Sequence, residues 1–412
     1  MPLVVAQAAA PAAPPVAANP ALSRGAAAPA PPSGLISVAL LVPLSGPSAE
    51  LGRAMLDAAQ MALFDIGSER LVLLPKDSTG TPEGAQRAAA AALADGASLI
   101  LGPVFSGSVA AVAPLATAAG VNVVAFSSDR AVARPGVFIM GFLFDQQLAR
   151  VIRFAIERGL SRFAVLAPAS QYGENVVREL RRETAATGSD FVDAVFYPAD
   201  TRDTSEIAAI VRAFTNYDAR RQALLAQRKW LAKQNDDVSR EALRRLGRYD
   251  TLGATHFDAV LLPEGGARLL TIAPLLAYYD VDLAEVRLLG TSQWEAAPLE
   301  QEPALLGGWF AAPPPEPRAD FEARFEAIYG RPPLRLASLA YDAVALAGAL
   351  VRLPGGPDFS TRMLTNAAGF RGVDGLFRFV ADGTNERALA VLEVTRDGIV
   401  TVSAAPKRLA VF

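Results

Sequence analysis

Short apolar runs alternate with amphipathic helical patterns along the chain from residue 35 onward. Residues 35–44, LISVALLVPL, are apolar almost throughout, which predicts a buried strand. In the next segment Leu51, Met55 and Ala58 fall on one face of a helical pattern. Three further apolar runs, RLVLLPKD, ASLILGP and VNVVAF, follow with helices between them. Apolar strands that alternate with helices indicate a parallel sheet covered on both faces.

The same alternation starts again near residue 143. The runs RFAVLAP, FVDAVFYP, FDAVLLP and VRLLGTS are predicted strands, separated by helical patterns. Near the end of the chain, the turn signals ADGTN and TRDG predict a β-hairpin. The sequence therefore predicts an α/β protein with two similar lobes in tandem.

These patterns divide the chain into five segments. They are an export-signal remnant with an Ala/Pro-rich tether (1–34), a first lobe (35–142), a second lobe (143–290) with a charged helical insertion (216–250), a return to the first lobe (291–358), and a C-terminal helix and hairpin assigned to the second lobe (359–412).

The leader is rich in alanine and proline, a composition that cannot bury a core and is predicted to be a disordered, extended tether. The stretch LVVAQA near the start is typical of an apolar signal core that runs into a cleavage site, although no Lys or Arg precedes Arg24. We expect the sequence to begin inside a longer export signal; the alternative is a low-complexity leader without function. Beyond the leader no apolar run is long enough for a membrane-spanning helix.

Composition excludes several classes of protein. The net charge is −3, which argues against a nucleic-acid-binding domain that works by overall positive charge. The chain has no cysteine, so disulfides, zinc–thiolate sites and a thiol nucleophile are excluded. No cluster of histidines or carboxylates marks a metal site, and we predict no cofactor.

The insertion at 216–250 departs from this charge balance, because it carries nine basic and five acidic residues, a local charge of +4. One interpretation is a solvated pair of helices, and the other is a docking surface for an acidic partner or a membrane face. The residues predicted to contact such a partner are Arg220, Arg221, Arg228, Lys229, Arg244 and Arg245.

Catalytic motifs are missing from the strand ends. A nucleophile elbow requires G-x-S-x-G, whereas Gly102 stands four residues before Ser106. The single histidine, His256, precedes a predicted strand, while sites in open α/β sheets collect at the carboxyl ends of strands. Neither the phosphate-binding G-x-x-x-x-G-K-[ST] pattern nor a strand-linked G-x-G-x-x-G is present. We predict no catalytic residue. The enzymatic alternatives are a Ser–Lys dyad, although no S-x-x-K lies near the serine turns, and a hydrolase whose turnover depends on His256.

Small polar residues instead follow three strands of the first lobe. They are Ser45, the turn Ser106-Gly107-Ser108, and Ser127-Ser128. The carboxyl ends of parallel strands meet at one edge of a sheet, and helices that start there present free backbone N–H groups. These hydroxyls are therefore predicted to hold a small polar ligand, with Tyr172 of the second lobe on the opposite side.

At these positions the chain resembles a known family. The segments SGPSAELG (45–52), LGPVFSG and SQYGE (170–174), together with Asp77, are similar to the type 1 periplasmic binding fold, in its branched-chain amino-acid-binding branch. The resemblance implies two doubly wound parallel-sheet lobes joined by a hinge around an interlobe cleft. It also implies that Ser106 and Ser127 or Ser128 hold the ligand's carboxylate and amine.

Two positions depart from this family. Leu51 stands where the family often has an aromatic residue, and Gln293 and Trp294, with Glu295 next, occupy the region that supplies an acid for an ammonium group. We add Glu264 and Trp294 to the candidate ligand-binding residues. The tether, the insertion and the segment from DAVLLPEGG to LLGTSQW resemble penicillin-binding-protein activators, which are outer-membrane lipoproteins.

The sequence thus leaves two functional predictions. The first is an exported, non-catalytic cell-envelope regulator that contacts a peptidoglycan synthase, located in the periplasm and associated with the outer membrane through a lipid anchor that this chain does not contain. The alternative is a substrate-binding protein that delivers an amino acid or similar small polar ligand to an ABC permease. Sugar-responsive repressors share the fold, but the Ala/Pro leader cannot form their helix-turn-helix.

Overall fold

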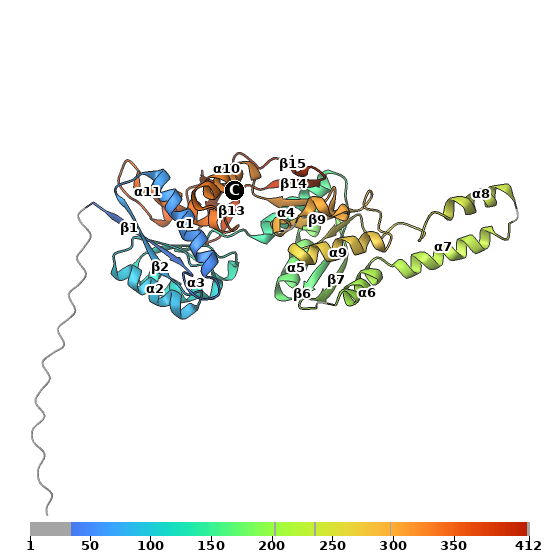
Figure 1. Cartoon of the computed structure of the whole chain (residues 1–412), viewed down its shortest axis with the longest axis horizontal. Helices are drawn as coiled ribbons and strands as arrows, with labels where there is room; N and C mark the ends of the chain where they lie inside the picture. The colour runs from blue at the N-terminus through green and yellow to red at the C-terminus, as the bar shows by residue number, and fades with distance from the viewer. Residues whose placement is uncertain (1–33, 202, 235, 297, 410–412) are drawn as a thin grey trace, which may run out of the picture.

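The computed structural model describes residues 34–201, 203–234, 236–296 and 298–409, and the predicted export signal and nearly all of the tether lie outside the described residues. The chain forms two lobes side by side, with a pair of helices extending from the second lobe (Figure 1). Within the described ranges no helix is both long and apolar enough to cross a membrane.

The first lobe contains a five-stranded parallel sheet in the order β2-β1-β3-β4-β5. Its strands are β1 (Ile36–Val42), β2 (Leu71–Asp77), β3 (Leu99–Leu101), β4 (Asn122–Ala125) and β5 (Val137–Ile139). Its helices are α1 (Ala49–Ile66), α2 (Pro82–Ala94), α3 (Ser106–Ala119), α10 (Pro315–Tyr329), α11 (Ala337–Val351) and α12 (Thr361–Leu364).

Alternate residues of β1 enter two different cores. Val38 and Leu40 pack with α1 and α11 on one face of the sheet, whereas Ala39 and Leu41 pack with α2 and α3 on the other. Because both faces are covered, the strand has to be apolar at successive positions. This arrangement confirms the parallel sheet predicted for the first half of the chain.

The second lobe contains a seven-stranded sheet in the order β15-β14-β10-β9-β8-β6-β7, in which β14 and β15 are antiparallel additions. Its strands are β6 (Arg162–Ala169), β7 (Asp190–Pro198), β8 (Ala259–Leu261), β9 (Arg287–Thr291), β10 (Trp309–Ala312), β14 (Ala390–Thr395) and β15 (Gly398–Ser403). Its helices are α4 (Phe144–Glu157), α5 (Gln171–Thr187), α6 (Thr204–Phe214), α7 (Tyr217–Leu231), α8 (Asp237–Leu246) and α9 (Gly266–Tyr278). Helices α4 and α5 cover one face, and α6 and α9 cover the other.

The chain passes between the lobes three times: after β5, after β10, and before β14. We expected the return to the first lobe at residue 291, but β10 still pairs with β9, so the return begins after Ala312. We also assigned everything after residue 359 to the second lobe. The structure divides this segment, because the sheet of β11 (Phe370–Gly372), β12 (Gly375–Phe379) and β13 (Asn385–Arg387) packs on the first lobe's core, and only β14 and β15 join the second.

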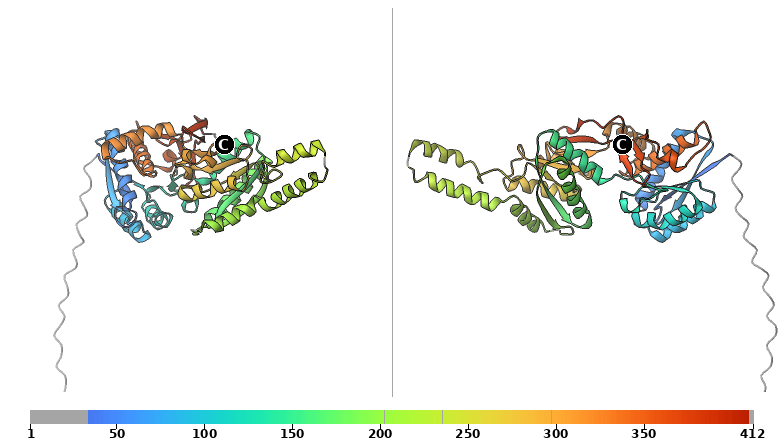
Figure 2. Two further views of the ribbon diagram at one scale, coloured as in Figure 1. Left: turned by 45° about the vertical axis from the view of Figure 1, so that its right-hand side comes forward. Right: turned by 180° about the vertical axis from the view of Figure 1, so that it is seen from behind.

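Helices α7 and α8 form the predicted insertion, which we call the α7–α8 hairpin (residues 217–246). It extends away from both lobes in each view (Figures 1 and 2). Arg228 of α7 donates to the carbonyl oxygens of Leu246 (2.5 Å) and Tyr249 (2.9 Å), which fixes α7 to the end of α8.

A network of buried charges lies where the chain crosses between the lobes. Asp374 is fully buried and pairs with Arg335 at 2.9 Å. Burial alone would raise the pKa of Asp374, but the nearby guanidinium groups of Arg335 and Arg387 hold it below its usual value. Asp342 of α11 accepts hydrogen bonds from the backbone N–H of Val373 (2.7 Å) and Asp374 (3.4 Å). Burial, and next the charge of Asp374, raise the pKa of Asp342 to about 7.

This shift predicts that Asp342 makes stability depend on pH. Its folded-state pKa lies above the unfolded value, so its stabilising contribution is complete below pH ~4 and is lost as the pH rises to about 7. Within this window the free energy of unfolding is expected to fall by up to about 1.4 kcal/mol per pH unit through this group. Urea unfolding of the protein and of Asp342→Asn from pH 5 to 8 measures the difference, and parallel pH profiles would contradict it.

Candidate ligand-binding cleft

A hollow of about 340 Å³ lies at the carboxyl ends of β3 and β4, and it brings together three of the predicted residues. Ser106, Ser127 and Ser128 line it. Ser127 is buried, and its Oγ accepts a hydrogen bond from the backbone N–H of Asp129 (3.1 Å), whereas Ser128 is exposed. The apolar part of the hollow's wall is formed by Val104, Phe105, Phe126, Phe142 and Leu336.

Helix α3 begins at Ser106 on the edge of this hollow. Its N-cap residue is Phe105, whose side chain cannot cap the helix with a hydrogen bond. Its first-turn N–H groups have no intrahelical partners, and they carry the positive end of the helix dipole. Gly102 makes the tight turn before the helix possible, because its φ is +93° and a Cβ there would lie 2.2 Å from the carbonyl oxygen of Leu41. The site can therefore accept a carboxylate.

A second hollow, of about 320 Å³, lies between the two lobes and continues from the first. Ser128 and Asp129 line both hollows, and Asn175 and Arg178 of α5 close the second from the other lobe. At its edge Arg130 of the first lobe pairs with Asp145 of the second at 3.1 Å. Together the two hollows form a cleft with residues from both lobes.

Three predicted residues of the first lobe lie outside these hollows. Ser45 is exposed, and its backbone N–H and that of Leu44 donate to Asp77 Oδ1. Gly107 is exposed beside Pro82. Ser108 is buried within the first lobe, and its Oγ makes no hydrogen bond to the described residues. Of the three-residue turn, only Ser106 lines the hollow.

Tyr172 and Glu264 both stand at the carboxyl ends of second-lobe strands. Tyr172, in the first turn of α5, packs edge-on against Phe144 with ring centroids 5.6 Å apart, and burial raises the pKa of its hydroxyl to about 12. Glu264, after β8, accepts a hydrogen bond from the hydroxyl of Tyr197, which is completely buried. Burial, and next this hydrogen bond, raise the pKa of Tyr197 far above its usual value. Tyr172 and Glu264 do not line the two hollows.

The comparisons with known proteins agree with this architecture. A family model described as periplasmic binding protein matches residues 35–398. The chain belongs to the periplasmic binding protein family. No curated protein matches this periplasmic binding protein in sequence.

Several solved structures share the fold at low sequence identity. A putative branched-chain amino acid ABC transporter protein from Rhodospirillum rubrum has a TM-score of 0.69 and 17% identity, covering 89% of this chain and 100% of its own. The substrate binding protein of Streptococcus pneumoniae in complex with isoleucine has a TM-score of 0.57 and 18% identity, covering 90% and 100%. A solute binding protein from R. palustris in complex with benzoate has a TM-score of 0.58 and 19% identity, covering 90% and 97%. The last two of these structures are described as binding proteins.

The prediction that Trp294 binds the ligand of this periplasmic binding protein is wrong. Its side chain has 0% exposure and packs in the core under α9, where Nε1 donates to the carbonyl oxygen of Leu262 (3.0 Å). Gly290 and Gly308 leave the space for the indole, because a Cβ at these positions would lie 2.1 Å and 2.8 Å from it. Trp294 is a packing residue of the second lobe.

The acid next to it, Glu295, is held by two cations of the first lobe. Arg318 of α10 lies 2.6 Å and Arg335, before α11, lies 3.3 Å from its carboxylate oxygens. The guanidinium of Arg335 also stacks on Phe142, 4.3 Å from the ring centroid. Glu295 is therefore an interlobe ion-pair residue, and it is not free to receive an ammonium group.

The residues predicted to contact a partner fall into two groups. Arg220 and Arg228 are structural, since both donate to backbone carbonyl oxygens, and the side chain of Arg220 is only 10% exposed. The other four are exposed on the α7–α8 hairpin: Arg221, Lys229, Arg244 and Arg245. Arg244 and Arg245 share Glu241 as an ion-pair partner.

His256 stands before β8, at the amino end of the sheet, with Nε2 3.3 Å from Asp193 Oδ2. The serine-bearing strand ends belong to the first lobe's sheet and are carboxyl ends, so His256 is not grouped with them. Within the described ranges no group of His, Cys, Asp or Glu is arranged to hold a metal ion.

The sequence analysis missed the apolar wall of the cleft. Phe105 and Phe126 each directly precede a predicted ligand-binding serine in the sequence, and this position could have identified them as residues of the cleft. Phe142 lies at the first crossing between the lobes, and Leu336 lies much later in the chain, between α10 and α11, so no local pattern connects them.

Proposed function

We propose that this protein binds a small carboxylate with an apolar body in the interlobe cleft and delivers it to an ABC permease. The proposal rests on one observation: Ser106, the first turn of α3 and a wall of phenylalanine side chains face the same hollow. The N–H groups and hydroxyls suit the carboxylate, and the phenylalanines suit the apolar body. Relatives with this fold were solved with isoleucine and with benzoate, and both ligands have this composition. Delivery from the periplasm fits the family.

The cleft offers no unpaired acid among the described residues to bind an ammonium group of the ligand. The acid in the region where the family places one, Glu295, is held by Arg318 and Arg335. Three acids line the cleft, and each already has a partner. Asp129 Oδ1 accepts from the N–H of Ala131 (2.9 Å), Asp145 pairs with Arg130 (3.1 Å), and Glu179 pairs with Arg182. We therefore rank carboxylates without an amine, such as benzoate, ahead of amino acids.

Ser106→Ala is expected to weaken binding of the carboxylate by about 10- to 100-fold, because a hydrogen bond to a charged group contributes about 1.5–3 kcal/mol. Ser108→Ala is the matched control: it removes the same hydroxyl from the same helix turn, but from a buried position outside the hollow. Calorimetric titration with benzoate and isoleucine measures both variants. Equal affinities in the two variants would contradict this site.

A second candidate function is regulation of a peptidoglycan synthase, and the α7–α8 hairpin favours it. The hairpin projects from the lobe, carries the exposed Lys229 and Lys233, and exposes Trp230 to 56%. Such a surface complements an acidic patch on a synthase.

Lys229→Glu with Lys233→Glu is expected to reduce capture of a synthase by at least about tenfold while leaving benzoate binding unchanged, because each reversal places like charges at the interface. Pull-down with purified synthase measures this. Glu substitutions of Arg352 and Lys407, on other parts of the surface, are the control. Unchanged capture, or no capture by the unmodified protein, would remove this candidate.

A further inference from the structure

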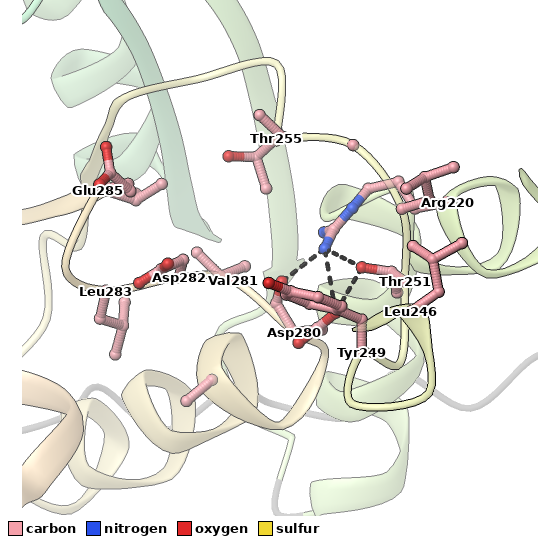
Figure 3. Close-up of a pocket in the computed structure, with 15 residues that line it drawn as sticks. Arg220, Leu246, Tyr249, Thr251, Thr255, Asp280, Val281, Asp282, Leu283 and Glu285 are labelled. Atoms are coloured by element: carbon pink, nitrogen blue, oxygen red, sulfur yellow. Dashed lines mark hydrogen bonds and ion pairs between the residues drawn. The ribbon is translucent and has the colours of Figure 1, made fainter. Parts of the chain in front are cut away.

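A third hollow, of about 700 Å³, lies at the base of the α7–α8 hairpin (Figure 3). It is bounded by residues 251–255, which precede β8, and by residues 280–286, which precede β9. It therefore opens at the amino ends of these strands, whereas the ligand cleft lies at the carboxyl ends. Any occupant of this hollow is separate from the cleft ligand.

The wall nearest the hairpin is held by Arg220 (Figure 3). Its Nη2 donates to Thr251 Oγ1 (2.6 Å) and to the carbonyl oxygen of Asp280 (2.5 Å). The carboxylate of Asp280 lies 3.8 Å from the same guanidinium, and it also accepts from Thr251 Oγ1 (2.5 Å). The positive charge of Arg220 is thus compensated inside the wall.

The remaining charges at this hollow are negative. Asp282 and Glu285 line it and are exposed, and Asp282 Oδ1 accepts from the backbone N–H of Ala284 (2.9 Å), which fixes that carboxylate at the rim. Helix α9 ends beside it, with Ala277 in the lining, and its C-terminus contributes the negative end of the helix dipole. With Arg220 paired, the hollow favours a cation.

The rest of the lining is apolar. Leucine and valine side chains face the hollow from the hairpin and from the lobe: Leu246, Leu252, Val281, Leu283 and Val286. Tyr249 stands at the edge with its side chain 57% exposed, and a tyrosine ring attracts a cation over its face. The volume lies within the range of small-molecule sites, about 300–1,000 Å³.

We propose that this hollow binds an organic cation with an apolar body, such as an aromatic or alkyl ammonium ion. The ammonium group lies between Asp282 and Glu285, and the apolar body packs against the leucine and valine side chains. Leu246 is the last residue of the α7–α8 hairpin and Tyr249 comes shortly after it, whereas Asp282 and Glu285 belong to the lobe. The bound cation therefore also holds the hairpin against the lobe.

Calorimetric titration of the full chain with phenethylamine tests this proposal. Phenylacetate serves as the probe of similar shape and opposite charge. The Ser106→Ala background separates this site from the cleft. We expect saturable binding of phenethylamine in that background and at least tenfold weaker binding of phenylacetate.

Asp282→Asn with Glu285→Gln is expected to weaken phenethylamine binding by at least tenfold. The matched control is Asp320→Asn with Glu300→Gln, which removes the same charge from two other exposed positions and should leave the affinity unchanged. The proposal is overturned if phenethylamine does not bind, if phenylacetate binds equally well, or if both double variants bind alike.

Discussion

Replacing Glu295 with alanine is expected to lower the free energy of unfolding by about 1.5–3 kcal/mol, because it removes the common partner of two half-buried cations, each of which keeps one other acid. The side chain of Glu295 is 11% exposed and lies between Arg318 and Arg335. Arg318 would then keep its pair with Glu322, and Arg335 would keep its pair with Asp374. Urea unfolding monitored by circular dichroism measures the loss.

The surrounding residues supply a matched control. Glu322 also pairs with Arg318, at 3.2 Å, but it is 48% exposed. Glu322→Ala is expected to cost less than about 1 kcal/mol, because exposed ion pairs contribute little. Similar losses in both variants would show that the Glu295 pairs act as ordinary surface pairs.

The same substitution also tests how the lobes are connected. Glu295 follows β9 of the second lobe, whereas Arg318 lies in α10 and Arg335 lies just before α11 of the first lobe. The network therefore crosses between the lobes beside Phe142, which lines the ligand cleft. Loss of the acid should also favour separation of the lobes, visible as an increased radius of gyration in solution scattering.

The parallel strands of both sheets were predictable because local patterns determine them. In β1, both faces meet helices, so Val38, Ala39, Leu40 and Leu41 are all buried and the strand is apolar at every position from Val38 to its end. The serine-bearing strand ends follow from the same topology, because the carboxyl ends of parallel strands share one edge. Ser106, Ser127 and Ser128 could therefore be grouped from the sequence alone.

The roles of Trp294 and Glu295 were not predictable in this way. Burial of Trp294 depends on the space left by Gly290 and Gly308, on either side of it in the sequence. The pairing of Glu295 depends on two arginines, Arg318 and Arg335, that follow the next crossing between the lobes. Sequence spacing carries no information about such long-range contacts.

The basic insertion shows the same limit at the level of single charges. Its composition correctly indicated a charged helical pair, but not which arginines are available. Arg220 binds Thr251 and Asp280, while Lys229 remains exposed on the same helix. Helical spacing shows that two residues lie on different faces of α7. Which face is covered depends on where the loop after α8 lies, and the spacing does not give that position.

Replacing Trp294 with alanine is expected to lower the free energy of unfolding by about 3–5 kcal/mol, because it creates a large cavity in the second lobe's core and leaves the carbonyl oxygen of Leu262 without its donor. Trp294→Phe should recover part of the loss, since it refills much of the volume but not the hydrogen bond. Gly290→Ala should also destabilise the lobe, because its Cβ would overlap the indole.

Trp230 of the α7–α8 hairpin provides the control for this experiment. It is 56% exposed, so Trp230→Ala is expected to change the free energy of unfolding by less than about 1 kcal/mol. Urea unfolding of the four variants distinguishes packing from ligand contact, because a ligand-binding tryptophan would reduce affinity without this loss of stability. If Trp294→Ala unfolds at the same urea concentration as Trp230→Ala, the indole does not stabilise the second lobe as the structure indicates.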